Sequence, residues 1–202
     1  AVSARTIAAR RSASSFSGAP LPPGALRQVL GRLRTPLATD LPAGANPLGI
    51  TRLLLDDTPD PQADPGVPEV AVRRSSHHSP GRIEDAFLGQ TQLCGARAVV
   101  LFHAPLAALT DREAGPLREA AFRAGFLGQL VYLGATEAGA GVTGVGGFDS
   151  ALWKELAVLP EDHEVVYVVA LGAAGPAADT KLDRADPAYD NGERRRTCSP
   201  TS

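Results

Sequence analysis

The spacing of apolar residues along the chain predicts a sheet inside a single α/β domain. Residues 96–103 and 164–171 are apolar at nearly every position and rich in valine. A continuous apolar run of this length is typical of a strand that is covered on both faces of its sheet. Residues 50–55 are a further strand candidate, and residues 69–73 alternate in character, as expected for a short strand.

Short helices are predicted where apolar residues recur at intervals of three and four. The clearest example is 26–33, which is apolar at positions 26, 29, 30 and 33. Serine often caps a helix N-terminus by accepting a backbone hydrogen bond, so we expect Ser3 and Ser150 to be caps. The other short helices are predicted at 3–10, 84–93 and 150–156.

A long helix is predicted at 117–138. Thr110 and Glu113 precede it with the spacing of a capping box, and its second half is apolar around the whole circumference, as expected for a buried helix. Gly139 is expected to end it, and a glycine-rich turn is expected at 144–148. Small residues that would let another helix approach closely occur at Ala121, Ala124, Gly125 and Gly128.

Composition and charge exclude several functional classes. The 202 residues are 44% hydrophobic and 21% charged, with a net charge of −2, so no overall basic field favours nucleic acid or an anionic membrane. The longest apolar run, 124–136, is shorter than the ~20 residues that span a bilayer. Residues 1–9 lack the apolar segment of a secretory leader. We therefore expect a cytoplasmic protein that uses neither nucleic acid nor membrane.

The cysteines and histidines predict no metal centre. Cys94 and Cys198 lie far apart and have no cysteine or histidine at metal-ligand spacing, so both are interpreted as free thiols. The four histidines form neither an HxH nor an HExxH pattern. Residues 1–176 are predicted to form the domain. Residues 177–202 are polar, carry three consecutive arginines and are predicted to be an extended or disordered arm.

The segment from Arg10 to Ser17, RRSASSFS, resembles the opening motif of nitroreductases, in which a basic pair and a serine follow the first helix. In that family these residues hold the phosphate of FMN. Guanidinium groups suit this role because they keep their charge and carry several donors. Ser14 stands where the family motif has a further arginine after the basic pair, so one positive charge is absent. Taken alone, the segment is more typical of a helix that ends in a solvated arginine pair.

Two later segments resemble the same family. Residues 125–135, GFLGQLVYLGA, are similar to the long central helix of its SagB-type branch, with Gln129 as a polar residue that needs a partner. Residues 144–149, GVGGFD, resemble the loop whose backbone lies against the flavin ring, which assigns Val145, Gly146 and Gly147 to the cofactor site. Glycine is suited to such a place because backbone can approach a planar ligand closely.

The resemblance implies a nitroreductase-like α+β fold, with a mostly antiparallel sheet, flanking helices and a long buried central helix. It also implies a homodimer with FMN at the interface. Lys181 and Arg184 lie at a plausible distance after the last strand to reach the phosphate. The SagB-type (azoline dehydrogenase) branch oxidises azoline rings of a peptide to azoles during natural-product maturation, and biosynthetic partner proteins are then expected.

No catalytic residue is carried over. The Lys-Tyr pair of the branch would fall near Asp111 and Arg112, and neither residue matches. Two alternatives therefore stay open. One is an NAD(P)H-dependent reductase of nitro compounds or quinones, or another small-molecule flavin dehydrogenase. The other is a degenerate family member that acts as a non-catalytic partner subunit.

Overall fold

The computed structural model describes residues 2–34, 48–55, 70–74, 79–110 and 115–175. Within these ranges one five-stranded sheet has the strand order β2-β1-β3-β5-β4. Its strands are β1 (Gly49–Leu54), β2 (Val70–Arg74), β3 (Ala98–Pro105), β4 (Gly141–Val145) and β5 (His163–Gly172). Only β1 and β2 pair in parallel, while β1 with β3, β3 with β5, and β5 with β4 are antiparallel.

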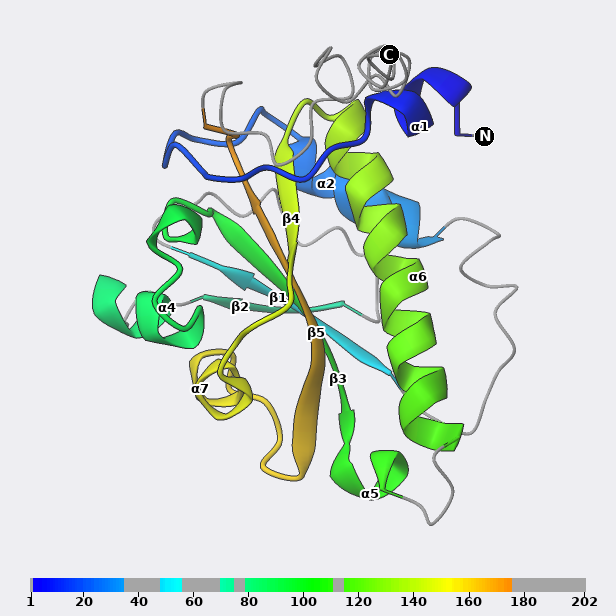
Figure 1. The fold of residues 1–202 in the computed structure, drawn as a ribbon, viewed down its shortest axis with the longest axis vertical. Helices are drawn as coiled ribbons and strands as arrows, with labels where there is room; N and C mark the ends of the chain where they lie inside the picture. Colours follow the sequence, from blue (N-terminus) through cyan, green and yellow to red (C-terminus); the bar gives the residue numbers. More distant parts are fainter. Residues whose placement is uncertain (1, 35–47, 56–69, 75–78, 111–114, 176–202) are drawn as a thin grey trace, which may run out of the picture.

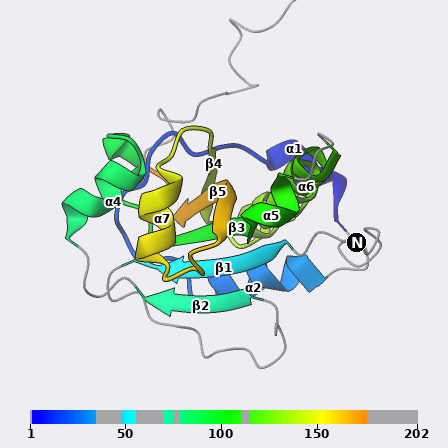
Figure 2. The same cartoon turned by 90° about the horizontal axis from the view of Figure 1, so that it is seen from below.

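Helices cover both faces of this sheet (Figure 1). One face carries α2 (Ala25–Gly31) and the long α6 (Gly115–Glu137), with α1 (Ala4–Ala9) beside the end of α6. The other face carries α4 (Pro80–Ala86) and α7 (Ser150–Leu156), which pack against each other. Figure 2 shows the same division from below, with α4 and α7 on one side and α5 (Leu106–Leu109) with α6 on the other.

The core consists of two apolar layers, one on each face of the sheet, and β3 supplies both. Val99 and Leu101 pack with the layer under α4 and α7, whereas Val100 and Phe102 pack with the layer under α2 and α6. This alternation follows from the two-residue period of a strand. It explains why the segment is apolar at nearly every position, because each face of the strand is buried.

Most of the predicted elements are confirmed, with small shifts of their ends. The four predicted strands correspond to β1, β2, β3 and β5, and the helix predicted at 3–10 is α1, with Ser3 accepting a hydrogen bond from the Thr6 N–H at 3.0 Å. The long helix is α6, which begins at Gly115. The predicted capping box lies partly outside the described residues, which omit 111–114.

Three local predictions are wrong. The helix predicted at 84–93 ends at Ala86 and starts earlier, because Pro80 occupies its first turn, where proline is tolerated. Residues 141–145, expected as the helix end and a glycine turn, form strand β4, because pairing with β5 overrides the weak strand preference of glycine. The cap of α7 is Asp149, whose carboxylate accepts from the Leu152 N–H at 2.9 Å, rather than Ser150.

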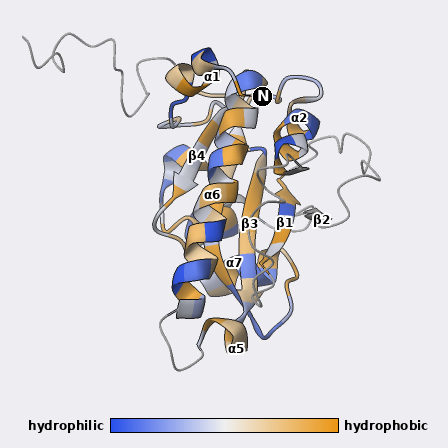
Figure 3. Cartoon of the chain, turned by 90° about the vertical axis from the view of Figure 1, so that its right-hand side faces the viewer, coloured by the Kyte–Doolittle hydropathy of each residue, from blue (hydrophilic) through white to orange (hydrophobic). Residues whose placement is uncertain are grey.

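Helix α6 changes character along its length. From Leu130 to Ala135 six consecutive residues are buried, as predicted from the all-round apolar pattern. Its first half is exposed on one side, with hydrophobic bands between hydrophilic residues on the outward surface (Figure 3). The small residues divide in the same way, because Ala124 and Gly128 face inward while Ala121 and Gly125 are exposed.

Candidate functional site

The arginine-serine segment crosses the start of β4, the edge strand of the sheet (Figure 1). Helix α1 ends at Ala9, and the chain turns at Arg10 into extended backbone. The Ala13 N–H donates to the Val142 carbonyl at 2.9 Å, and Phe16 forms an isolated bridge to Ala174. The segment is thereby fixed along the free edge of β4.

Tyr132 of α6 connects this segment to β4. Its phenol oxygen accepts from the Gly144 N–H at 2.6 Å and lies 2.9 Å from Ser12 Oγ. The guanidinium carbon of Arg10 lies 5.4 Å from the centre of the Tyr132 ring, at the distance of a cation–π contact. One buried side chain therefore joins two sequence motifs that are 132 positions apart when counted from Ser12 to Gly144.

A second tyrosine, Tyr167 of β5, lies against the same glycine. A Cβ atom on Gly144 would come within 2.1 Å of the Tyr167 hydroxyl, and a Cβ atom on Gly128 would come within 2.6 Å of its ring. Glycine is required at both positions to leave room for this ring. Burial raises the pKa of Tyr167, and repulsion from Tyr132 raises it further.

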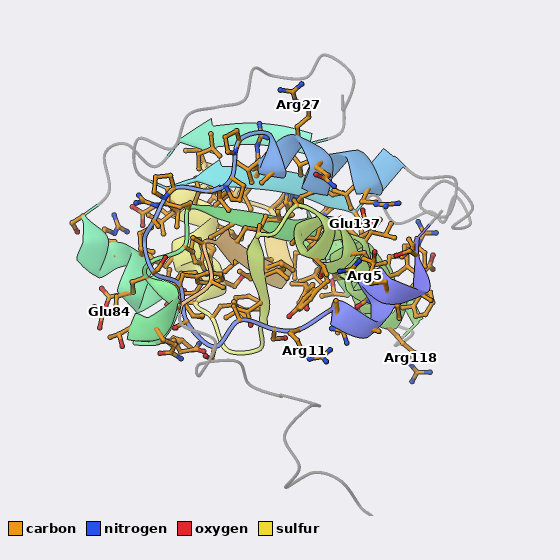
Figure 4. All side chains as sticks on the ribbon, turned by 90° about the horizontal axis from the view of Figure 1, so that it is seen from above. Arg5, Arg11, Arg27, Glu84, Arg118 and Glu137 are labelled. Carbon is orange, nitrogen blue, oxygen red and sulfur yellow. The ribbon has the colours of Figure 1, made fainter. Side chains whose placement is uncertain are left out.

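Arg10 and Arg11 lie beside these two tyrosines, and neither has an acidic partner among the described residues. Arg11 donates to the carbonyls of Ala8 and Arg10, each at 2.8 Å, and so caps the end of its own helix. Figure 4 shows Arg11 on the segment that leaves α1, at the outer side of the molecule. The nearby acid Glu137 is engaged by Arg32 and Thr6 instead.

The glycine loop that follows β4 is held by the segment after α4. The Gln90 amide donates to the Gly147 carbonyl and to the Phe87 carbonyl, both at 2.8 Å. Val145 is buried at the end of β4, while Gly146 and Gly147 are exposed. Nothing lies within 4 Å of the position that a Cβ atom of Gly146 would occupy. The loop therefore presents open backbone on one side and is anchored on the other.

The structure does not bring every predicted site residue together. Gln129 is exposed on α6, so the prediction of a polar group within a buried stretch is wrong for the single chain. The Ser14 Oγ is buried and has no hydrogen-bond partner among the described residues. Lys181 and Arg184 lie outside the described residues, as do Asp111 and Arg112.

Sequence reasoning missed Tyr132, Tyr167 and Gln90. Both tyrosines occur within apolar runs, where an aromatic residue is usually part of the core. A signal was present in Gly128 and Gly144, since glycine inside a helix or strand indicates a close approach by another group. Nothing in the sequence indicated that the two glycines flank one ring.

The residues of the site fit a flat cofactor that carries a phosphate. Two guanidinium groups and the Ser12 hydroxyl supply donors for a dianion, and the glycine loop supplies open backbone near them. Within the same described ranges, no three side chains of histidine, cysteine, aspartate or glutamate are grouped to hold a metal ion. No described helix is long and apolar enough to cross a membrane.

The sequence profile of the Nitroreductase family matches residues 50–173. The chain therefore belongs to the nitroreductase family, whose members are flavin-dependent oxidoreductases. No curated protein matches the sequence significantly.

Several solved structures share the fold at low sequence identity. A nitroreductase family protein from Clostridium novyi NT is 15% identical with a TM-score of 0.55, over 87% of this chain and 86% of that chain. A structure described as an oxidoreductase containing FMN is 15% identical with a TM-score of 0.57, over 94% and 91%. An NADPH:FMN oxidoreductase from Vibrio harveyi, in complex with NAD+, is 18% identical with a TM-score of 0.57, over 89% and 71%. The predicted nitroreductase-like α+β fold is confirmed.

Proposed function

We propose that the chain is an FMN-dependent oxidoreductase that works as a homodimer. The observation that carries this proposal is the contact of Tyr132 with both Ser12 and Gly144. It places the arginine-serine motif beside the strand that ends in the glycine loop. Two motifs with separate roles in flavin binding thus belong to one site, and the family is flavin-dependent.

The phosphate end of the site consists of Arg10, Arg11 and Ser12. Guanidinium and hydroxyl groups donate charge-assisted hydrogen bonds to phosphate oxygens. Ser14 adds no positive charge where the family motif has an arginine. We propose that Lys181 and Arg184 supply the remaining charge, from the same chain or from its partner.

The ring end of the site is the backbone that follows β4. The Val142 carbonyl and the Gly144 N–H both point away from β5, toward Ala13 and Tyr132. By the same alternation Gly146 is the next residue directed outward, and its N–H has no partner among the described residues. An open glycine N–H is a suitable donor to a ring nitrogen of the flavin, with Val145 and Gly147 on either side.

A second copy of the chain completes the site in this proposal. The outward side of α6 carries Leu117 and Phe122, which are 52% and 66% exposed. Gly125 lies three residues after Phe122, and Gln129 lies four residues after Gly125, so the three residues share one stripe of the helix. Exposed apolar residues in this number favour an interface, and family members are typically homodimers with FMN. Gln129 would then reach the cofactor of the partner chain.

Bound FMN would supply two-electron transfer, and the protein would bind, orient and shield it. We propose an azoline ring of a peptide as the substrate, in line with the SagB-type pattern of residues 125–135. Oxidation to the azole removes two electrons and two protons, and oxygen is the final acceptor. Biosynthetic partner proteins would then deliver the peptide. An NAD(P)H-dependent reductase is the alternative, and the fold shared with the Vibrio harveyi NADPH:FMN oxidoreductase is its support.

The substrate is tested by a direct comparison of two reactions. We expect the protein with FMN to convert a thiazoline peptide to the thiazole in air, with a mass loss of about 2 Da and consumption of oxygen. Rapid NADPH oxidation with a nitroarene, and no change in the peptide, would instead identify the reductase. If FMN is bound but neither reaction occurs, a non-catalytic partner subunit is favoured.

The phosphate site is tested by the double variant Arg10→Ala/Arg11→Ala. We expect the affinity for FMN to fall about 100-fold or more, because each charge-assisted bond contributes ~1.5–3 kcal/mol. The affinity for riboflavin, which has no phosphate, should change little. Arg27→Ala removes an exposed charge from α2 and is the control (Figure 4). Unchanged FMN affinity in the double variant would show that these arginines only end α1.

A further inference from the structure

One of the two hydrogen bonds at the Tyr132 hydroxyl has a direction that is fixed by chemistry. The Gly144 N–H can only donate, so the phenol oxygen accepts from it at 2.6 Å. The phenol has one proton, and Ser12 Oγ, at 2.9 Å, is the side-chain acceptor beside it among the described residues. Either hydroxyl of this pair can donate. In the arrangement used below the phenol donates to Ser12, which leaves the proton of the Ser12 hydroxyl for a third group.

The surroundings of Tyr132 keep its hydroxyl in a fixed position between Gly144 and Ser12. Its side chain is 7% exposed, so water competes little for the phenol. The Gly144 amide belongs to β4, whose pairing with β5 fixes its position, while Tyr132 comes from the buried half of α6. The Gly144 amide and the Tyr132 phenol are therefore both held by rigid elements, whereas a serine hydroxyl alone rotates to suit its surroundings.

We propose that Tyr132 is a positioning residue that orients the Ser12 hydroxyl as a hydrogen-bond donor to the cofactor phosphate. This inference rests on the proposed FMN site. The chain of donors runs from Gly144 N–H to the Tyr132 hydroxyl, then to the Ser12 hydroxyl, and each bond polarises the next. The ring of Tyr132 also lies under the Arg10 guanidinium at 5.4 Å and holds a second donor on the same side.

The variant Tyr132→Phe removes the hydroxyl and keeps the ring. We expect its dissociation constant for FMN to rise about 10-fold, while the constant for riboflavin stays within about twofold, because the lost effect acts at the phosphate. Equal weakening of FMN and riboflavin would show a general packing role and overturn the proposal. An unchanged preference for FMN over riboflavin in Tyr132→Phe would also overturn the proposal.

A double-mutant cycle with Ser12→Ala tests whether the two residues act together. We expect Ser12→Ala to lose as much of the FMN preference as Tyr132→Phe, and the double variant to lose no more than Ser12→Ala. If the double variant lost the product of the two single-variant losses in FMN preference, Tyr132 would not act through Ser12. If Tyr132→Phe does not fold, full FMN preference in Ser12→Ala alone overturns the proposal.

Tyr167→Phe is the matched control, since it removes the other hydroxyl near Gly144. It should keep the preference for FMN, and its loss of preference would contradict a specific role of Tyr132. In the flavin-free protein, the Gly144 amide should exchange its hydrogen faster in Tyr132→Phe than in wild type, and at the wild-type rate in Ser12→Ala. Wild type that binds neither flavin would refute the proposed function itself, whereas wild type that binds FMN with an unaltered Tyr132→Phe preference refutes this inference alone.

Discussion

Two histidines are in contact at the start of β5, away from the proposed cofactor site. His103 of β3 is 7% exposed, and its Nδ1 lies 2.7 Å from Nδ1 of His163. Its Nε2 lies 3.0 Å from the Thr51 hydroxyl, and Gly49 leaves room for its ring, since a Cβ there would come within 2.4 Å. Burial and, to a smaller extent, repulsion from His163 together lower the pKa of His103 to about 4.

This residue makes stability depend on pH. Above the unfolded pKa of about 6.5, His103 is neutral in both states. As the pH falls from about 6.5 toward 4, the unfolded chain binds a proton that the folded chain excludes, so folding becomes less favourable. We expect the free energy of unfolding to fall by up to about 3 kcal/mol over this range, at ~1.36 kcal/mol per pKa unit. Urea unfolding followed by tryptophan fluorescence measures it.

His103→Gln is the control for this prediction. Glutamine keeps hydrogen-bonding groups but does not titrate, so the pH dependence between about 6.5 and 4.5 should become flatter. Glu164 is a separate group, because hydrogen bonds from Lys154 and Ser150 lower its pKa below the usual value of 4.5, and its effect appears only at lower pH. An identical pH dependence in wild type and in His103→Gln would show that another group is responsible.

At the scale of elements, α6 has one half that needs no partner and one half that does. Leu130–Ala135 is covered by the chain itself, while Phe122 is 66% exposed. Phe122→Glu places a charge on the outward face without touching the core. Because a buried unpaired charge is costly, we expect this variant to be a monomer while wild type is a dimer. Light scattering coupled to size exclusion measures the mass.

Val158→Glu is the matched control for the dimer prediction. Val158 is 69% exposed and follows α7, the helix that lies on the other side of the sheet from α6 (Figure 2). It should leave the dimer intact. Gly128 is not suited to this test, because it faces Tyr167 inside the chain. A wild-type monomer at low micromolar concentration, or a dimer in Phe122→Glu, would contradict the proposed interface.

The central strands and the long helix could be predicted because burial imposes a regular pattern on them. Residues 96–103 are apolar at nearly every position since both faces of β3 are covered, and α6 is apolar all round where it is buried. Strand β4 could not be predicted, because glycine has no strand preference and the strand depends on pairing with β5. Helix α5 is a single turn, too short to show a helical period.

The candidate site could be predicted only in part, for a related reason. Arg10, Arg11, Ser12 and the glycine loop belong to recognisable local motifs. Tyr132 and Tyr167 act through contacts between distant segments, and their sequence surroundings are those of core residues. The exposure of Gln129 also depends on tertiary packing, because the helical pattern alone did not say which side of α6 meets the sheet.

At the scale of the whole molecule, the two faces of the sheet hold different parts of the proposed site. The face with α4 and α7 holds the glycine loop through Gln90, and the face with α6 holds the arginine-serine segment through Tyr132. The free edge of β4 lies between the two faces, next to both the glycine loop and the arginine-serine segment. The central claim is therefore that this edge binds FMN.

The most direct test is a titration of flavin-free wild-type protein with FMN. We predict a yellow protein that retains about one FMN per chain after gel filtration, with a dissociation constant of about 1 μM or lower and weaker binding of riboflavin. The flavin absorbance and fluorescence of the protein fraction report both quantities. A protein that stays colourless after incubation with excess FMN, while folded by circular dichroism, would contradict the account.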